Sequence, residues 1–172
     1  MRALLHRLVV ATAVLGAVCF VGVESMILYQ LGGQFLPYIP RSADEFAGYF
    51  MGTSAFLALA HTFVDGEHIR VTLLMERVKP GLRHVLERIA VTLAAAMAGY
   101  LAFYISKLAW QSWQFDERSS GLIALPMWFP QAAMALGATT FFLVVAERAW
   151  RVWRGEPMAI QPAAEEVLRG DR

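Results

Sequence analysis

The sequence predicts an all-α integral membrane protein with four transmembrane helices and a short amphipathic interfacial helix in the cytoplasmic loop between spans two and three. First, its 172 residues are 58% hydrophobic and 17% charged, with a mean hydropathy of +0.48; soluble domains average about 45–50% apolar and about 25% charged residues. Second, four windows approach the about 20 apolar residues that a spanning helix needs. Third, all five tryptophans lie beside window ends, as in an interfacial aromatic belt.

The same numbers exclude several classes of protein. Disordered chains are poor in aromatic residues and rich in charge, whereas 12% of this chain is aromatic. A net charge of +1 excludes a strongly basic nucleic-acid binder. The single cysteine, Cys19, forms neither an intrachain disulfide nor a cysteine-based zinc site. Phosphate-loop, metalloprotease and nucleophile-elbow motifs are absent from the sequence, so we predict a protein that is not an enzyme and has no cofactor.

The four predicted spans cover about residues 8–29, 46–64, 89–108 and 127–146, and residues 155–172 form a predicted cytoplasmic tail. Residues 1–172 are therefore interpreted as one membrane domain. The first window is interpreted as a retained span, because its apolar run exceeds the about 7–15 residues of a signal-peptide core. Val18 before Cys19 also does not resemble a lipoprotein cleavage site.

Helix-boundary residues separate these windows. Ser42 and Glu45 have the spacing of a capping box, which predicts the start of the second span. Asp65 and Gly66 end that span, and Pro80 breaks the chain before the third. Pro126 suits the first turn of the fourth.

The distribution of Lys and Arg predicts the orientation. With four spans, both termini and the loop between spans two and three share one side. Of 15 basic residues only three, Arg41, Lys107 and Arg118, fall on the other side, which leaves twelve on the side of the termini. Because cytoplasmic loops carry the excess of Lys and Arg, we predict cytoplasmic N- and C-termini.

Two helical patterns concern packing. Val71, Leu74, Met75 and Val78 follow an i, i+3, i+4, i+7 spacing, which predicts the interfacial helix; the alternative is an extension of a span into water. Pairs of small residues four positions apart predict close helix contacts, namely Gly48/Gly52, Ala95/Gly99 and Ala133/Gly137.

Ionisable residues suggest two alternative functions. Glu24 is the acid well inside a predicted span, and an intramembrane carboxylate is a candidate functional site. One interpretation is that it is the binding carboxylate of a small multidrug-type exporter. The other is that it forms a hydrogen bond or ion pair with a neighbouring helix or subunit. Paired histidines would indicate a haem-binding membrane anchor of a respiratory enzyme, but only His61 lies inside a window, unlike His6, His68 and His84.

Two segments resemble a known family. Asp44 and Glu45 open the second span, and Gly66 followed by His68-Ile69-Arg70-Val71 comes just after it. Before and within the fourth span stand Ser120, Gly121, Pro126, Trp128 and Gly137. Both segments are similar to the DctQ-like small membrane subunit of tripartite ATP-independent periplasmic (TRAP) transporters.

The resemblance implies a small permease subunit in a bacterial inner membrane, acting in ion-gradient-driven uptake of an organic acid. Its implied partners are the lipid bilayer, a large permease subunit that carries the substrate and sodium sites, and a periplasmic substrate-binding protein. Between Trp113 and Trp128 lies a charged cluster on the predicted periplasmic side, which is the candidate docking site for the binding protein or else a simple connector: Asp116, Glu117, Arg118 and Ser119.

Overall fold

The computed structural model describes residues 2–33, 42–64, 80–121 and 123–155. They form four helices, α1 (Arg2–Gly33), α2 (Ala43–Val64), α4 (Pro80–Gln114) and α5 (Trp128–Trp153). All four are long and apolar enough to cross a membrane, which confirms the predicted all-helical chain with four spans. The predicted interfacial helix and the Gly66–Val71 motif lie outside the described residues.

All four helices are longer than the predicted windows, and the difference is largest for α4 and α1. α4 contains 35 residues and α1 contains 32. At 1.5 Å per residue α4 is about 52 Å long, well beyond the about 30 Å thickness of the hydrocarbon core. The windows located the part that suits hydrocarbon, whereas each helix continues through charged flanks that also favour helical backbone.

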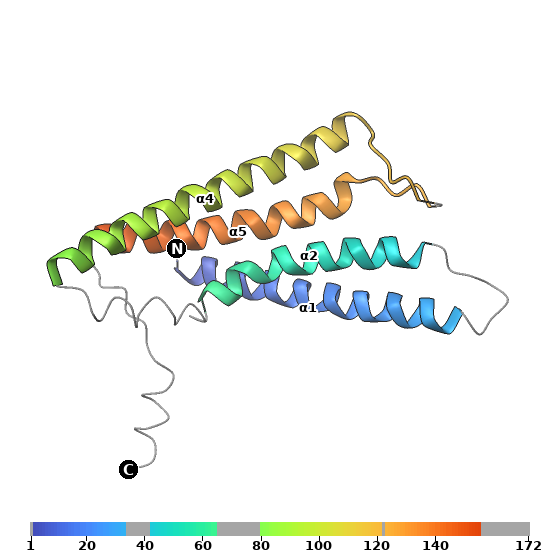
Figure 1. Cartoon of the computed structure of the whole chain (residues 1–172), viewed down its shortest axis with the longest axis horizontal. Coiled ribbons are helices and arrows are strands. Elements are labelled where there is room, and N and C mark those ends of the chain that lie inside the picture. The colour runs from blue at the N-terminus through green and yellow to red at the C-terminus, as the bar shows by residue number, and fades with distance from the viewer. Residues whose placement is uncertain (1, 34–41, 65–79, 122, 156–172) are drawn as a thin grey trace, which may run out of the picture.

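The helices form a row (Figure 1), in the order α1, α2, α5, α4. Chain neighbours pair as two antiparallel hairpins, α1 with α2 and α4 with α5, and contact between α2 and α5 joins the hairpins. α4 packs chiefly against α5, and the contact between α1 and α5 is small. The row therefore leaves α1 and α4 as edge helices.

Small residues allow the helices of the row to approach closely. A Cβ added to Gly16 of α1 would lie 3.3 Å from Cβ of Leu57 in α2. Gly137 of α5 lies directly against the backbone of α2, where an added Cβ would be 2.8 Å from the Leu57 nitrogen. Ala60 and Ala138 are fully buried. Such residues are enriched at membrane helix contacts because they let backbones meet.

The three predicted small-residue pairs have different outcomes. Gly99 lies under the Phe142 ring, whose nearest atom would be 3.0 Å from an added Cβ, so the Ala95/Gly99 face meets α5. Gly137 meets α2. Gly48, however, is exposed and has nothing within 4 Å of its Cβ position, so it makes no close contact among the described residues.

An apolar cluster connects three helices. Val9 of α1, Ala60 of α2 and Val144 of α5 are buried together. Beside them the rings of Phe63 and Phe141 pack edge to face with centroids 5.7 Å apart, a favourable aromatic geometry. This cluster adds apolar packing between the α1–α2 hairpin and α5.

The row has two chemically different ends (Figure 1). The starts of α1 and α4 and the ends of α2 and α5 lie together; we call this the arginine-rich end, because it carries Arg7, Arg88, Arg148, Arg151 and Arg154. The opposite end, called the loop end, carries the 115–127 connection between α4 and α5. Residues 2 and 155 thus lie at one end, as the even number of spans predicts, whereas the side of the membrane stays a prediction.

Tryptophans at the arginine-rich end make polar contacts. The Trp153 indole N–H donates to Thr92 Oγ1 at 3.1 Å, and the Arg88 guanidinium lies 5.5 Å from the Trp153 ring centroid. Arg154 is 4.9 Å from the Trp150 ring centroid. Cation–π contacts of this kind hold charged groups beside amphipathic rings, which is the expected environment at a membrane interface.

Candidate functional site

The 115–127 loop folds back on itself, and its described residues form a narrow hairpin. The Ser119 N–H donates to the Leu125 carbonyl, and the Met127 N–H donates to the Glu117 carbonyl, each at 2.9 Å. Arg118 and Pro126 face each other in an isolated antiparallel bridge. The backbone that carries the predicted docking residues 116–119 is therefore held in place by hydrogen bonds across the hairpin.

Glu117 attaches this hairpin to α4. The hydroxyl of Ser112, which is fully buried, donates to Glu117 Oε2 at 2.6 Å, and the Glu117 N–H donates to the Ser112 carbonyl at 3.0 Å. A hydrogen bond to a carboxylate is stronger than one between neutral groups. Glu117 is exposed, but one oxygen of its carboxylate is engaged in holding the loop.

Ser119 also supports the loop itself. The residue is buried, and its hydroxyl oxygen accepts a hydrogen bond from the Gly121 N–H at 3.1 Å. This is the local side chain-to-backbone bond that serine offers in turns. Two of the four predicted docking residues therefore help to hold the loop in place, Glu117 through Ser112 of α4 and Ser119 through Gly121.

Asp116 and Arg118 are the exposed pair. The Arg118 guanidinium lies 3.1 Å from Asp116 Oδ2, and the side chains of Arg118 and Asp116 are 55% and 71% exposed. Asp116 has φ 47°, in the left-handed region that Asp and Asn tolerate better than most residues. Because both side chains are exposed, their charges are accessible to another molecule. The surface ion pair between them contributes little stability.

A second attachment joins the loop to the start of α2. The Tyr49 hydroxyl donates to Glu45 Oε1 at 2.6 Å and lies 3.4 Å from Met127 Sδ. On the other side of the Glu45 carboxylate lies Gly121, where an added Cβ would overlap the carboxylate and lie 2.7 Å from its Cδ. The structure therefore brings together two family-motif positions, Glu45 and Gly121, that are 76 residues apart in the sequence.

The predicted capping box at the start of α2 is wrong in its details. The Glu45 N–H donates to Asp44 Oδ1 at 2.9 Å, and the Glu45 carboxylate turns towards Tyr49. The Phe46 N–H reaches the Ser42 carbonyl at 3.2 Å. The acids still suit the positive end of the helix dipole, but Glu45 is used for contact with the loop.

The remaining motif residues of the fourth span stand beside this cluster. Pro126 lies in the bridge with Arg118, and Trp128 opens α5 with its ring edge-on to Phe129 at 6.0 Å. Ser120 is exposed. Sequence reasoning missed Tyr49, Met127 and Ser112. The contact of Tyr49 with Glu45 could have been inferred from their i, i+4 spacing on the second span.

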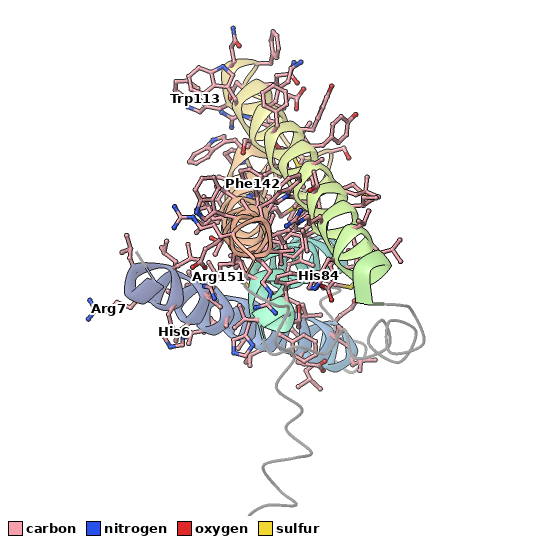
Figure 2. All side chains as sticks on the ribbon, turned by 90° about the vertical axis from the view of Figure 1, so that its left-hand side faces the viewer. His6, Arg7, His84, Trp113, Phe142 and Arg151 are labelled. Carbon is pink, nitrogen blue, oxygen red and sulfur yellow. The ribbon has the colours of Figure 1, made fainter. Side chains whose placement is uncertain are left out.

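The histidines described by the structure do not form a haem pair in the way the alternative requires. Figure 2, which looks onto the arginine-rich end, shows His6 on α1 and His84 on α4 at opposite sides of the row. His84 lies 3.8 Å from the Glu87 carboxylate, and His61 has a partner of its own. Within the described ranges there is also no group of three or more His, Cys, Asp or Glu side chains placed to hold a metal.

Glu24 occupies a different place from the loop cluster. It is exposed on α1, one of the two edge helices. Its neighbours Gly22 and Val23 face α2, where the Phe50 ring would lie 3.1 Å from a Cβ at Gly22. Glu24 therefore does not face the interior of the row.

Comparison with known proteins identifies the family. No curated protein matches the chain. Residues 25–155 match the family described as tripartite ATP-independent periplasmic transporters, DctQ component. The match runs from α1 to the end of α5 and includes both attachments of the loop. The chain therefore belongs to the DctQ family, the small permease component of TRAP transporters.

Proposed function

We propose that this chain scaffolds the large permease subunit and helps the periplasmic binding protein to dock, for ion-gradient-driven uptake of an organic acid. The family match supports a transporter component rather than an enzyme. The observation that carries the scaffold role is the open row of helices, whose edge helices present many large apolar side chains outward. A second membrane subunit can cover such surfaces, and the substrate and sodium sites belong to that subunit.

The position of Glu24 disfavours the exporter alternative. A drug-binding carboxylate would face a pathway between helices, whereas Glu24 lies on the outer side of an edge helix. The decisive experiment expresses the tagged chain with the large permease and the binding protein and purifies it in mild detergent. We expect the large permease to co-purify, and uptake to require all three proteins. Transport by this chain alone in proteoliposomes would contradict the proposal.

The orientation can be tested by cysteine labelling. We expect Ser120→Cys, exposed in the 115–127 loop, to react with an impermeant maleimide added to the periplasmic side, because positively charged segments stay in the cytoplasm. His84→Cys, exposed at the arginine-rich end, should react only after the membrane is opened. Cys19 is replaced by alanine in both variants. Ser119 is unsuitable, because it is buried. The reverse labelling pattern would overturn the orientation.

The docking role predicts opposite effects from two neutral substitutions. Asp116→Asn and Arg118→Gln each leave one charge of the exposed pair unbalanced, and Asn suits the left-handed backbone at position 116. We expect one variant to speed and the other to slow uptake, by about two- to fivefold at low salt, because rim charges act mainly on encounter rates. Both effects should fade in high salt.

The measurement is uptake into proteoliposomes as a function of binding-protein concentration and ionic strength. Glu117 is left unchanged, because its loss would release the loop from Ser112 and confuse docking with folding. Equal rates for wild type and both variants at every salt concentration would leave the loop a simple connector.

A further inference from the structure

One side of α1 is a continuous apolar stripe interrupted by a carboxylate. Its members follow the i, i+3, i+4, i+7 spacing that places residues on one helix face, and every one is exposed. We call it the Glu24 stripe: Ala17, Phe20, Val21, Glu24, Ile27, Leu28 and Leu31. α1 packs on α2 through other residues, with Gly16 against Leu57 and Gly22 against Phe50. The stripe itself is exposed, so no other described helix covers it.

The carboxylate in this stripe has no partner within the chain as described. Glu24 forms no hydrogen bond or ion pair with another described residue, whereas the neighbouring Ser25 hydroxyl donates to the Val21 carbonyl at 2.8 Å. Carboxylates in hydrocarbon are costly and normally pair with another group. The serine is satisfied by its own helix, but Glu24 is not.

The direction of the Glu24 side chain hinders its access to water. The nearer end of the predicted span is Tyr29, five residues or about 8 Å further along the axis. Cα–Cβ bonds in a helix tilt towards its N-terminus, so the side chain leans away from that nearer end and towards the middle of the span. The usual escape of a polar side chain to the interface is therefore disfavoured here.

We infer that the Glu24 stripe is the surface on which a transmembrane helix of the large permease subunit packs, with an uncharged hydrogen-bond donor of that helix bound to the Glu24 carboxylate. The inference rests on the proposed function and adds the contact surface and its chemistry. Lipid tails supply no donor. A second copy of this chain is a poor fit, because a two-fold interface would set like residues opposite each other and bring two carboxylates together.

The other edge helix provides the contrast. Ile89, Leu93 and Met97 of α4 are exposed at successive i, i+4 positions and carry no polar group. Such a face is satisfied by lipid tails. α4 therefore supplies matched control positions at similar exposure.

Site-specific photo-crosslinking tests the surface. A benzophenone side chain is placed at Phe20 or Leu28 in the stripe, or at Leu93 or Met97 on α4, in membranes that contain all three transporter proteins. We expect an adduct with the large permease from the two α1 positions and none from the two α4 positions. Adducts only from α4, or an adduct of two copies of this chain from Phe20, would overturn the inference.

Substitution of Glu24 tests the chemistry. We expect Glu24→Leu to lower the amount of large permease that co-purifies by about tenfold or more, because a donor buried opposite would lose its partner. Glu24→Gln keeps hydrogen-bonding capacity, so complex recovery and uptake should stay near wild type. Ile27→Leu is the control substitution in the same stripe, and the melting temperature of the isolated chain should be similar for all four proteins.

The outcomes separate this inference from the proposed function. If wild-type protein fails to capture the large permease, the proposed scaffold role fails. If wild type and Glu24→Leu capture it equally, the scaffold role stands and the assignment of Glu24 is wrong. If Glu24→Gln assembles normally but abolishes uptake, the carboxylate acts in coupling and the packing role is overturned.

Discussion

Replacing Gly137 by alanine is expected to destabilise the protein, although alanine is the better helix former. The added methyl group would lie 2.8 Å from the Leu57 nitrogen and closer still to the Phe56 carbonyl. These are backbone atoms, so no side chain can turn aside and α5 must move away from α2. Overpacking of this kind typically costs about 1–3 kcal/mol, and the α2–α5 contact is the one that joins the two hairpins. Thermal unfolding of the purified protein in detergent measures the effect.

Gly48→Ala is the matched control. Nothing lies within 4 Å of the Cβ position at Gly48, and the residue is exposed on α2. Here the same substitution should stabilise the helix by about 0.5–1 kcal/mol, because glycine loses more backbone entropy on folding than alanine. The two variants should thus shift the melting temperature in opposite directions. A rise for both would show that α2 and α5 do not meet at Gly137.

This pair of glycines also shows what sequence patterns leave undecided. Gly48 and Gly137 stand in the same small-xxx-small spacing, and each pattern permits close packing. Only the row arrangement distinguishes them: α5 lies over the backbone at Leu57, whereas no described helix reaches Gly48. Sequence periodicity describes a helix face but does not say which neighbour will occupy it.

The spans themselves were predictable because the bilayer imposes a length. A window of about 20 apolar residues is required whatever the tertiary structure, and the predicted 46–64 differs from α2 (Ala43–Val64) by three residues. The larger errors are at α1, α4 and α5, whose helices run on past the predicted windows into polar or charged segments. Hydropathy reports on the solvent around a helix rather than on where the backbone hydrogen bonds end.

The loop between α4 and α5 was predicted in composition but not in its internal roles. Four polar residues in a row appeared equivalent as docking candidates, yet Glu117 is bound to Ser112 and Ser119 is buried under the turn at Gly121. Asp116 and Arg118 alone form the exposed ion pair of this segment. The role of Glu117 depends on Ser112 of α4, and that of Ser119 on the turn that brings the Gly121 N–H to its hydroxyl. The composition of the loop does not indicate either contact.

Gly121→Val is expected to loosen the 115–127 loop from α2. The backbone of Gly121 is not in the left-handed region, so the effect comes from the clash of the new side chain with the Glu45 carboxylate. Either the loop moves or the carboxylate turns away and loses the 2.6 Å hydrogen bond from Tyr49. A hydrogen bond to a charged group contributes about 1.5–3 kcal/mol, and about 1.4 kcal/mol is a factor of ten. Trypsin should therefore cleave after the exposed Arg118 about ten times faster in the solubilised protein.

Three further variants identify the contact as the cause. Ser120→Val places the same side chain one residue earlier, at an exposed position, and should be cleaved at the wild-type rate. Glu45→Ala should itself speed cleavage, because it removes the acceptor of the Tyr49 hydroxyl. In the Glu45→Ala background, Gly121→Val should increase the cleavage rate little further, since the effects of substitutions at residues in contact are not additive. Two results would show that Glu45 does not hold the loop. One is that the effects of Gly121→Val and Glu45→Ala on the cleavage rate are fully additive, and the other is that Gly121→Val alone is cleaved at the wild-type rate.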